Sequence, residues 1–202
     1  MSQTAYAAPL PFASLLGAYG SAARVSIVAA EVANARLLEL RNPSASLLVV
    51  ITQLRIQWIQ TVGLTTQTLG EIEVFRLTNF TAVDTTNANA LAAIPKRSIY
   101  PAATAQTLNA GGAGVANGMT GGTLTKSSVA INRLSMLLQT AVPTSQFDPG
   151  QELRCLTNYP WNPPLVLAQN EGVLVENRNV MPAAGGSVVT IEIDWAEVRS
   201  YP

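Results

Sequence analysis

Carboxylate pairs are the residues of this chain whose type and spacing could support catalysis. Glu192, Asp194 and Glu197 fall on the solvent-facing side of the last predicted strand or just after it. Glu71 and Glu73 share one face of an earlier strand. Paired acids can hydrolyse glycosidic bonds, but acids that alternate along an exposed strand usually provide solvation or oppose edge pairing. We therefore expect no catalytic residue, and a sandwich-fold carbohydrate enzyme that uses Glu192 or Asp194 is an alternative hypothesis.

Other kinds of reactive site lack their usual residues. The chain has no histidine, so the commonest general base and the commonest metal ligand are missing. Cys155 is the only cysteine, which excludes an intramolecular disulfide and favours a small buried residue over a nucleophile. The glycine stretch GGAGVANG, residues 111–118, lacks the spacing of a phosphate-binding loop and is typical of a mobile loop. We expect neither a cofactor nor a bound metal.

The composition favours association. Of the 202 residues, 48% are hydrophobic and 12% are charged, and the net charge is zero. A soluble domain usually carries about 25% charged residues, and a neutral, charge-poor surface tends to associate. We expect much of the surface to be buried against copies or partners, although a chain merely rich in Ala, Thr, Asn and Gln would look the same. Since the basic residues form no patch and no apolar run approaches the ~20 residues of a membrane span, we expect neither nucleic acid nor a membrane as partner.

The elements that position these residues are predicted to be strands. The clearest pattern lies in residues 165–199, where three apolar runs are separated by two turns. In the last run, alternate residues are apolar and share one face, namely Val189, Ile191, Ile193 and Trp195. This period of two is typical of a half-buried antiparallel strand.

Similar signals predict further strands along the rest of the chain, at about 24–33, 37–40, 47–60, 71–77, 129–141 and 153–156. The 47–60 segment is long enough that we expect a bend or a β-bulge in it. Some eight short strands with turns between them predict an all-β fold, an antiparallel β-sandwich or jelly roll. We assign residues 23–202 to this one domain.

Two segments do not fit the strand pattern. Residues 1–22 are rich in Ala, Pro and Ser and are predicted to form an N-terminal arm, either with a short helix at about 13–19 or as an irregular segment on a neighbour. Residues 79–128 are rich in Ala, Thr, Asn and Gly and are predicted to be a long insertion loop. We expect this loop to lie on a neighbour or to be disordered, with a short strand near 97–100 and a flexible tip at 111–122.

Aromatic residues in these segments and loops are candidate interface contacts. They are Phe12, Tyr19, Tyr100, Tyr159 and Trp161. Tyr159 and Trp161 lie in a proline-rich loop and could form a platform for stacking a sugar. A subunit contact is the favoured interpretation, because aromatic side chains dominate the anchoring of protein interfaces.

Two passages resemble the virion structural proteins of tailed bacteriophages. The first is LLELRNPSASLLVVITQLRIQ (37–57), followed by EIEVFRLTNFT (71–81). The second is PLVLAQNEGVLVENRNVMPAAGGSVVTIEIDWAEV (164–198), with its acidic-glycine turn between apolar strands and its ending IEIDWAE. The resemblance implies a trimeric jelly roll that coats capsids or builds tail parts, without catalytic residues.

From the resemblance and the composition we expect a non-enzymatic structural protein of a tailed-phage virion. The first hypothesis is a capsid decoration or cement protein on the capsid exterior, which bridges capsomers. Its partners would be copies of itself, in a homotrimer, and the major capsid protein or other virion proteins. The alternative is a tail, baseplate or fibre component that contacts a host receptor through Tyr159 and Trp161.

Overall fold

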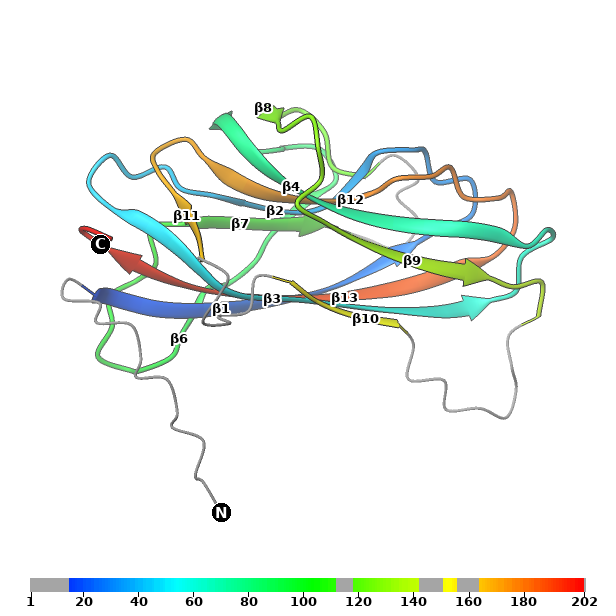
Figure 1. Ribbon diagram of the computed structural model, residues 1–202, viewed down its shortest axis with the longest axis horizontal. Coiled ribbons are helices and arrows are strands. Elements are labelled where there is room, and N and C mark those ends of the chain that lie inside the picture. Colours follow the sequence, from blue (N-terminus) through cyan, green and yellow to red (C-terminus); the bar gives the residue numbers. More distant parts are fainter. Residues whose placement is uncertain (1–14, 112–117, 142–150, 156–163, 202) are drawn as a thin grey trace, which may run out of the picture.

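The computed structural model describes residues 15–111, 118–141, 151–155 and 164–201, and the regular structure in these ranges is entirely strand (Figure 1). The strands are β1 (Leu15–Ile27), β2 (Ala35–Arg41), β3 (Leu48–Val62), β4 (Thr68–Ala82), β5 (Ala88–Ala90), β6 (Ile94–Pro95), β7 (Gln106–Ala110), β8 (Thr123–Lys126), β9 (Asn132–Leu138), β10 (Gln151–Cys155), β11 (Leu165–Leu167), β12 (Gly172–Asn177) and β13 (Gly186–Val198).

The strands form two antiparallel sheets that pack face to face (Figure 1). In sheet A the order is β10-β3-β13-β1-β6, and β11 also pairs with β3. In sheet B the order is β5-β7-β2-β12-β4-β8, and β9 also pairs with β4. One large apolar core lies between the sheets. The predicted all-β sandwich is confirmed.

The connectivity is that of a jelly roll. Four antiparallel pairs join the first half of the chain to the second: β1 with β13, β2 with β12, β3 with β10 and β4 with β9. The four main strands β1 to β4 alternate between the sheets, and so do their partners taken in reverse order. A long hairpin rolled up in this way gives the two interlocked sheets of a jelly roll.

Strand β13 lies in the centre of sheet A, with β1 on one side and β3 on the other. The predicted alternation along it is confirmed, since Val189, Ile191 and Ile193 are fully buried and Trp195 is almost so. The predicted irregularity in the long third strand is also confirmed. The pairing of β3 with β13 shifts register between Asp194 and Trp195, so that β3 turns even-numbered residues inward after this point and odd-numbered residues before it.

The predicted N-terminal arm of residues 1–22 is wrong for its last part. Strand β1 begins at Leu15 and pairs with β13 from that residue onward, so residues 15–22 belong to the sandwich and form no helix. The strand pattern in the sequence was weak because small residues fill β1, and the large apolar residues of its inward face are Tyr19, Val25 and Ile27. Residues 1–14 lie outside the described part of the chain.

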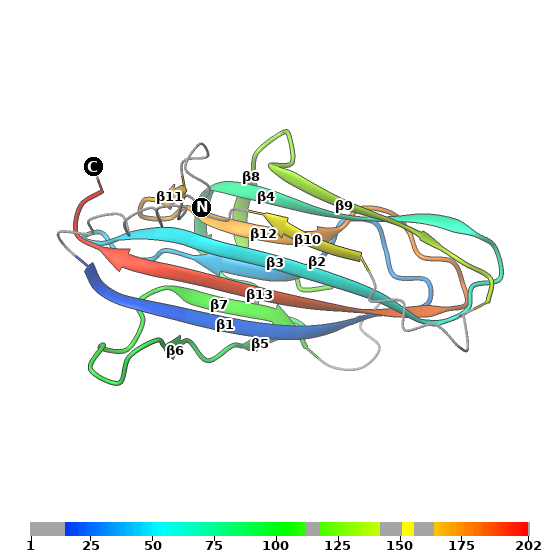
Figure 2. The same ribbon diagram turned by 60° about the horizontal axis from the view of Figure 1, so that its bottom comes forward.

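The predicted insertion loop folds back on its own domain instead of reaching away. Strand β4 continues to Ala82, and we call the segment between β4 and β9, residues 83–131, the strap. Its strands β5 and β7 extend sheet B beside β2, and β6 extends sheet A beside β1. Figure 2 shows β6 at the edge of the sandwich next to β1.

The predicted strand near 97–100 is wrong, because β6 comes earlier and a turn closes there, with the Tyr100 amide donating to the Arg97 carbonyl. The first residue and a later part of the strap cover the outer face of sheet B. There Val83 and Leu124 pack on a second small core of Phe75, Phe80 and Leu174. Residues 112–117, the middle of the predicted tip, lie outside the described ranges.

We predict that the inward face of β13 dominates stability. Ile191→Ala should lower the free energy of unfolding by about 2–5 kcal/mol, because it leaves a cavity in a fully buried site. The neighbouring Thr190→Ala, on the outer face, should cost less than about 1 kcal/mol. Urea denaturation followed by circular dichroism measures both. Equal losses for the two variants would contradict the assignment of the two faces.

Candidate interaction surfaces

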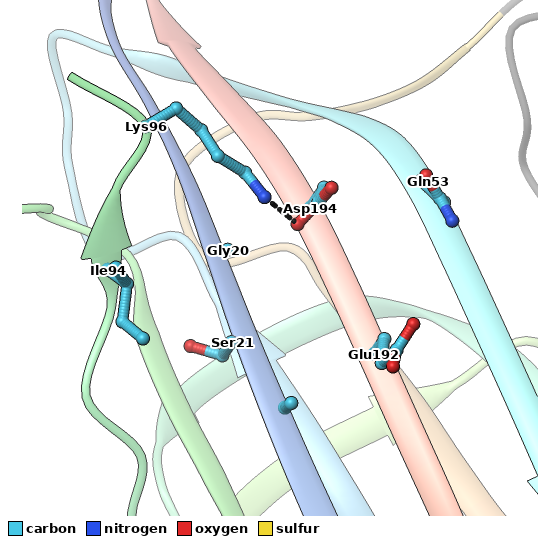
Figure 3. A pocket seen from close by; sticks show the side chains of 8 residues that line it. Gly20, Ser21, Gln53, Ile94, Lys96, Glu192 and Asp194 are labelled. Carbon is cyan, nitrogen blue, oxygen red and sulfur yellow. Dashed lines mark ion pairs between the residues drawn. The ribbon is translucent and has the colours of Figure 1, made fainter.

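A hollow on the outer face of sheet A contains the two acids that the sequence singled out (Figure 3). Its volume is about 270 Å³, and its floor is the backbone of β1 at Gly20 and Ala22. Lys96 of the strap stands on one side, and Glu192 and Asp194 of β13 stand on the other. The hollow is open and shallow, and small residues of β1 create it.

Each acid in this hollow is paired with a cation. Lys96 Nζ lies 2.8 Å from Asp194 Oδ1, and Arg55 Nη1 lies 3.2 Å from Glu192 Oε2. The two carboxylates point out of the same sheet face from positions two residues apart, so they stand side by side rather than across a substrate. Glycosidases place their two carboxyl groups on either side of the scissile bond. This geometry gives the hollow the character of a polar contact surface.

Glu197 is the exception among the predicted surface acids, because it is fully buried. Its Oε1 accepts hydrogen bonds from the backbone amides of Thr104 and Ala105, at 2.7 and 2.8 Å. Both amides belong to the strap, so this carboxylate fixes the middle of the strap to the end of β13. The expectation that Glu197 faces solvent is therefore wrong.

A second buried carboxylate holds the start of the strap. Glu39 of β2 accepts a hydrogen bond from the Asp84 amide at 2.8 Å, and its other oxygen has no hydrogen-bond partner. Asp84 Oδ1 in turn forms an ion pair with Arg36 Nη1 at 2.8 Å and accepts a hydrogen bond from the Gly122 amide at 2.5 Å. The beginning and the end of the strap thus meet at one charged cluster on sheet B. Sequence reasoning missed it, because nothing local marks Glu39 as different from an exposed acid.

Burial raises the pKa of two carboxyl groups to about 7, those of Glu31 and Glu39. Desolvation is the main cause in both. For Glu39 the nearby Asp84 adds to the rise, while the Asp84 amide, Arg36 and Arg41 oppose it. Below pH 7 both groups are therefore largely neutral in the folded chain.

The predicted contact residues have different locations. Tyr19 is fully buried beneath the strap, where its hydroxyl donates to the Pro101 carbonyl at 3.0 Å and its ring centroid lies 5.8 Å from that of Trp195. It is thus a core residue of the chain rather than a surface residue. Tyr100 is half-buried beside it, at 6.4 Å between ring centroids.

Three other predicted contact residues lie outside the described part of the chain, namely Phe12, Tyr159 and Trp161. Cys155 ends β10, and its side chain is likewise not described. Glu71 and Glu73 share the outer face of β4 as predicted, but Glu73 is buried beneath Arg133 and Arg178 instead of exposed.

Several large apolar side chains are exposed on ordered elements. On the strap, Ile94 is 65% and Ile99 is 81% exposed. On the outer face of sheet B, Leu69 and Leu137 form a directly opposed cross-strand pair, and each is about half exposed. Strands and a tied-down strap hold these side chains in place, which suits them to contact a partner.

Comparison with protein-family models, curated proteins and solved structures returned no match for this chain. Among the described residues, no cluster of three or more acidic, cysteine or histidine side chains could hold a metal ion. The same part of the chain contains no helix that could cross a membrane.

We predict that Glu197 fastens the strap. Glu197→Ala should leave the buried Ala105 amide and the partly buried Thr104 amide without an acceptor and destabilise the fold by roughly 1–3 kcal/mol, with faster proteolysis between 91 and 105. Glu197→Gln keeps an acceptor oxygen and should be cleaved nearly as slowly as the wild type. Limited proteolysis with mass spectrometry compares the three proteins. Resistance of Glu197→Ala equal to that of the wild type would rule out this anchoring.

We predict a pH dependence of stability from Glu39. Its pKa is raised on folding from 4.5 to about 7, so the folded state retains the proton longer, and the free energy of unfolding falls as pH rises through this interval. Glu39→Gln keeps the acceptor but cannot ionise. The free energy of unfolding of Glu39→Gln should equal that of the wild type near pH 4 and exceed it by up to about 3 kcal/mol at pH 8. Urea denaturation between pH 4 and pH 8 measures the free energy of unfolding of both proteins. A constant difference between them across this range would contradict the prediction.

Proposed function

We propose that this chain is a non-enzymatic structural protein of a tailed-phage particle, namely a capsid decoration or cement protein that bridges capsomers on the head. The jelly roll supports the proposal, since viral capsid domains share this architecture with lectins and cupins. The fold alone leaves these classes open, so the argument depends on the surface.

The observation that carries the proposal is apolar exposure on a chain with few charges. Eleven large hydrophobic side chains of the described residues are exposed, among them Ile94, Ile99, Leu69 and Leu137. The whole chain carries only 12 basic and 12 acidic residues, which cancel. Charge repulsion therefore does little to keep copies apart, and burial of the apolar side chains favours association.

The passages that resemble phage structural proteins build the centre of the roll. Residues 37–57 and 71–81 cover most of β2, β3 and β4, and residues 164–198 cover β11 to β13. The acidic-glycine turn joins the two sheets. There Glu171 accepts the Ala168 amide at 2.8 Å and pairs with Arg76 at 2.7 Å. The resemblance thus concerns the central strands and the turn that joins the two sheets, rather than a peripheral loop.

Because the strap lies on its own domain, neighbouring molecules would meet ordered surfaces. The exposed strap residues Ile94 and Ile99 and the Leu69–Leu137 pair on sheet B are the contact points that we assign to copies of the chain or to capsid proteins. Assembly would then bury existing surface without the need to order a long arm, which lowers the entropy cost of binding.

Light scattering and sedimentation of the purified chain test the proposed association. We expect a trimer that persists on dilution. Ile94→Ser with Ile99→Ser, or Leu69→Ser with Leu137→Ser, should dissociate it, while Thr190→Ser on the outer face of sheet A should not. A wild-type monomer at all concentrations would overturn the argument from apolar exposure. Co-sedimentation with isolated phage heads tests the location, and binding to tails or host cells instead would exclude the cement role.

A further inference from the structure

A second cavity lies on the outer face of sheet B, between β4 and the loop that follows β8. Its volume is about 400 Å³. Its lining is rich in hydrogen-bond donors and includes Lys126, Ser127, Ser128, Arg133 and Arg178, with the ring of Phe75 among them. We call this cavity the cationic groove.

The cations of the groove lie nearer the surface than the carboxylates that pair with them. The side chains of Lys126, Arg133 and Arg178 are 35%, 52% and 49% exposed. Their carboxylate partners lie beneath them, with Glu176 only 2% and Glu73 only 4% exposed. The surface that a partner meets is therefore mainly cationic, because Glu73 and Glu176 are buried and Glu71, which also pairs with Arg133, is only 17% exposed.

The buried carboxylates hold the cations in fixed positions. Lys126 Nζ lies 2.5 Å from Glu176 Oε1 and 4.3 Å from the centre of the Phe75 ring. Glu73 binds Arg133 through one oxygen and lies 3.6 Å from Arg178 Nε through the other. An ammonium has three donors and a guanidinium has five, so these pairings leave further N–H groups for a ligand. Such preorganisation lowers the entropy that binding must overcome.

We propose that the cationic groove binds carboxylate side chains from an acidic, partly apolar segment of a partner protein. Charge-assisted hydrogen bonds from the three cations would hold the carboxylates. The neighbouring Val129, which is 73% exposed, and Ile131, which is 41% exposed, would pack on the apolar residues of the segment.

The charge balance favours a protein segment over nucleic acid. The three cations are matched by Glu71, Glu73 and Glu176, so the groove exerts short-range hydrogen bonding without a strong long-range field. Nucleic-acid binding depends on an excess of positive charge that releases counterions along the phosphate backbone. This inference does not depend on the virion proposal, since it concerns one groove of the isolated chain.

Fluorescence anisotropy with a labelled ten-residue peptide of alternating Glu and Leu tests the groove on the full chain. We expect saturable binding that weakens at least tenfold in Val129→Glu, which adds a competing carboxylate at an exposed rim position and should leave the fold intact. Lys126→Gln with Arg133→Gln should weaken it to a similar extent. The matched control, Lys96→Gln with Arg97→Gln on the strap, should bind as the wild type does.

Three results with peptides would overturn the proposal. They are no binding by the wild type at millimolar peptide, equal affinity of Val129→Glu and the wild type, and equal binding of a peptide with Lys in place of Glu. Binding of a single-stranded oligonucleotide in preference to the acidic peptide would assign the groove to nucleic acid and would also overturn it.

Discussion

Strand β13 is hydrogen-bonded on both sides over nearly all of its length, to β1 and to β3, and this double pairing fixes the rest of the roll. Its alternation turns one row of apolar side chains into the core. A shift of one residue would exchange the buried and exposed faces, so the register is strongly determined. The bulge in β3 keeps both ends of that strand in step with β13 and lets two differently phased apolar runs face the same core.

The strap depends on the same strand. Glu197 continues the inward row of β13 beyond Trp195, and it holds backbone amides of the strap where an apolar residue would have continued the core. Glu39 holds the strap from sheet B in the same way. Buried carboxylates are costly unless they are hydrogen-bonded, so each stabilises the fold only while the strap is in place. The result is a self-contained body whose contact surfaces are formed before any partner arrives.

Sequence patterns predicted the elements whose own residues alternate, and they failed where partners lie far away in the chain. The core face of β13 and the irregularity of β3 followed from local apolar spacing. The strand predicted at 24–33 is in fact β1, which starts at Leu15 and ends at Ile27, and its first part was missed because its Gly, Ala and Ser residues carry little hydrophobic signal. The alternation of β13, continued past Trp195, places Glu197 on the inward row, unlike Glu192, but the amides that bind Glu197 come from residues more than 90 positions away. The cationic groove likewise joins residues of β4, β8, β9 and the segment after β12.

Amide hydrogen exchange across the full chain, read by mass spectrometry at peptide resolution, tests most directly whether the strap and the roll form one body. If they do, the central strands β13, β3 and β12 exchange only through global unfolding, and the strap segments 88–95 and 104–110 show clear protection in the isolated protein. Exchange of these strap segments at the rate of an unstructured peptide, beside a protected β13, would contradict this structure. The strap would then be a free arm, and its contacts would form only on a partner.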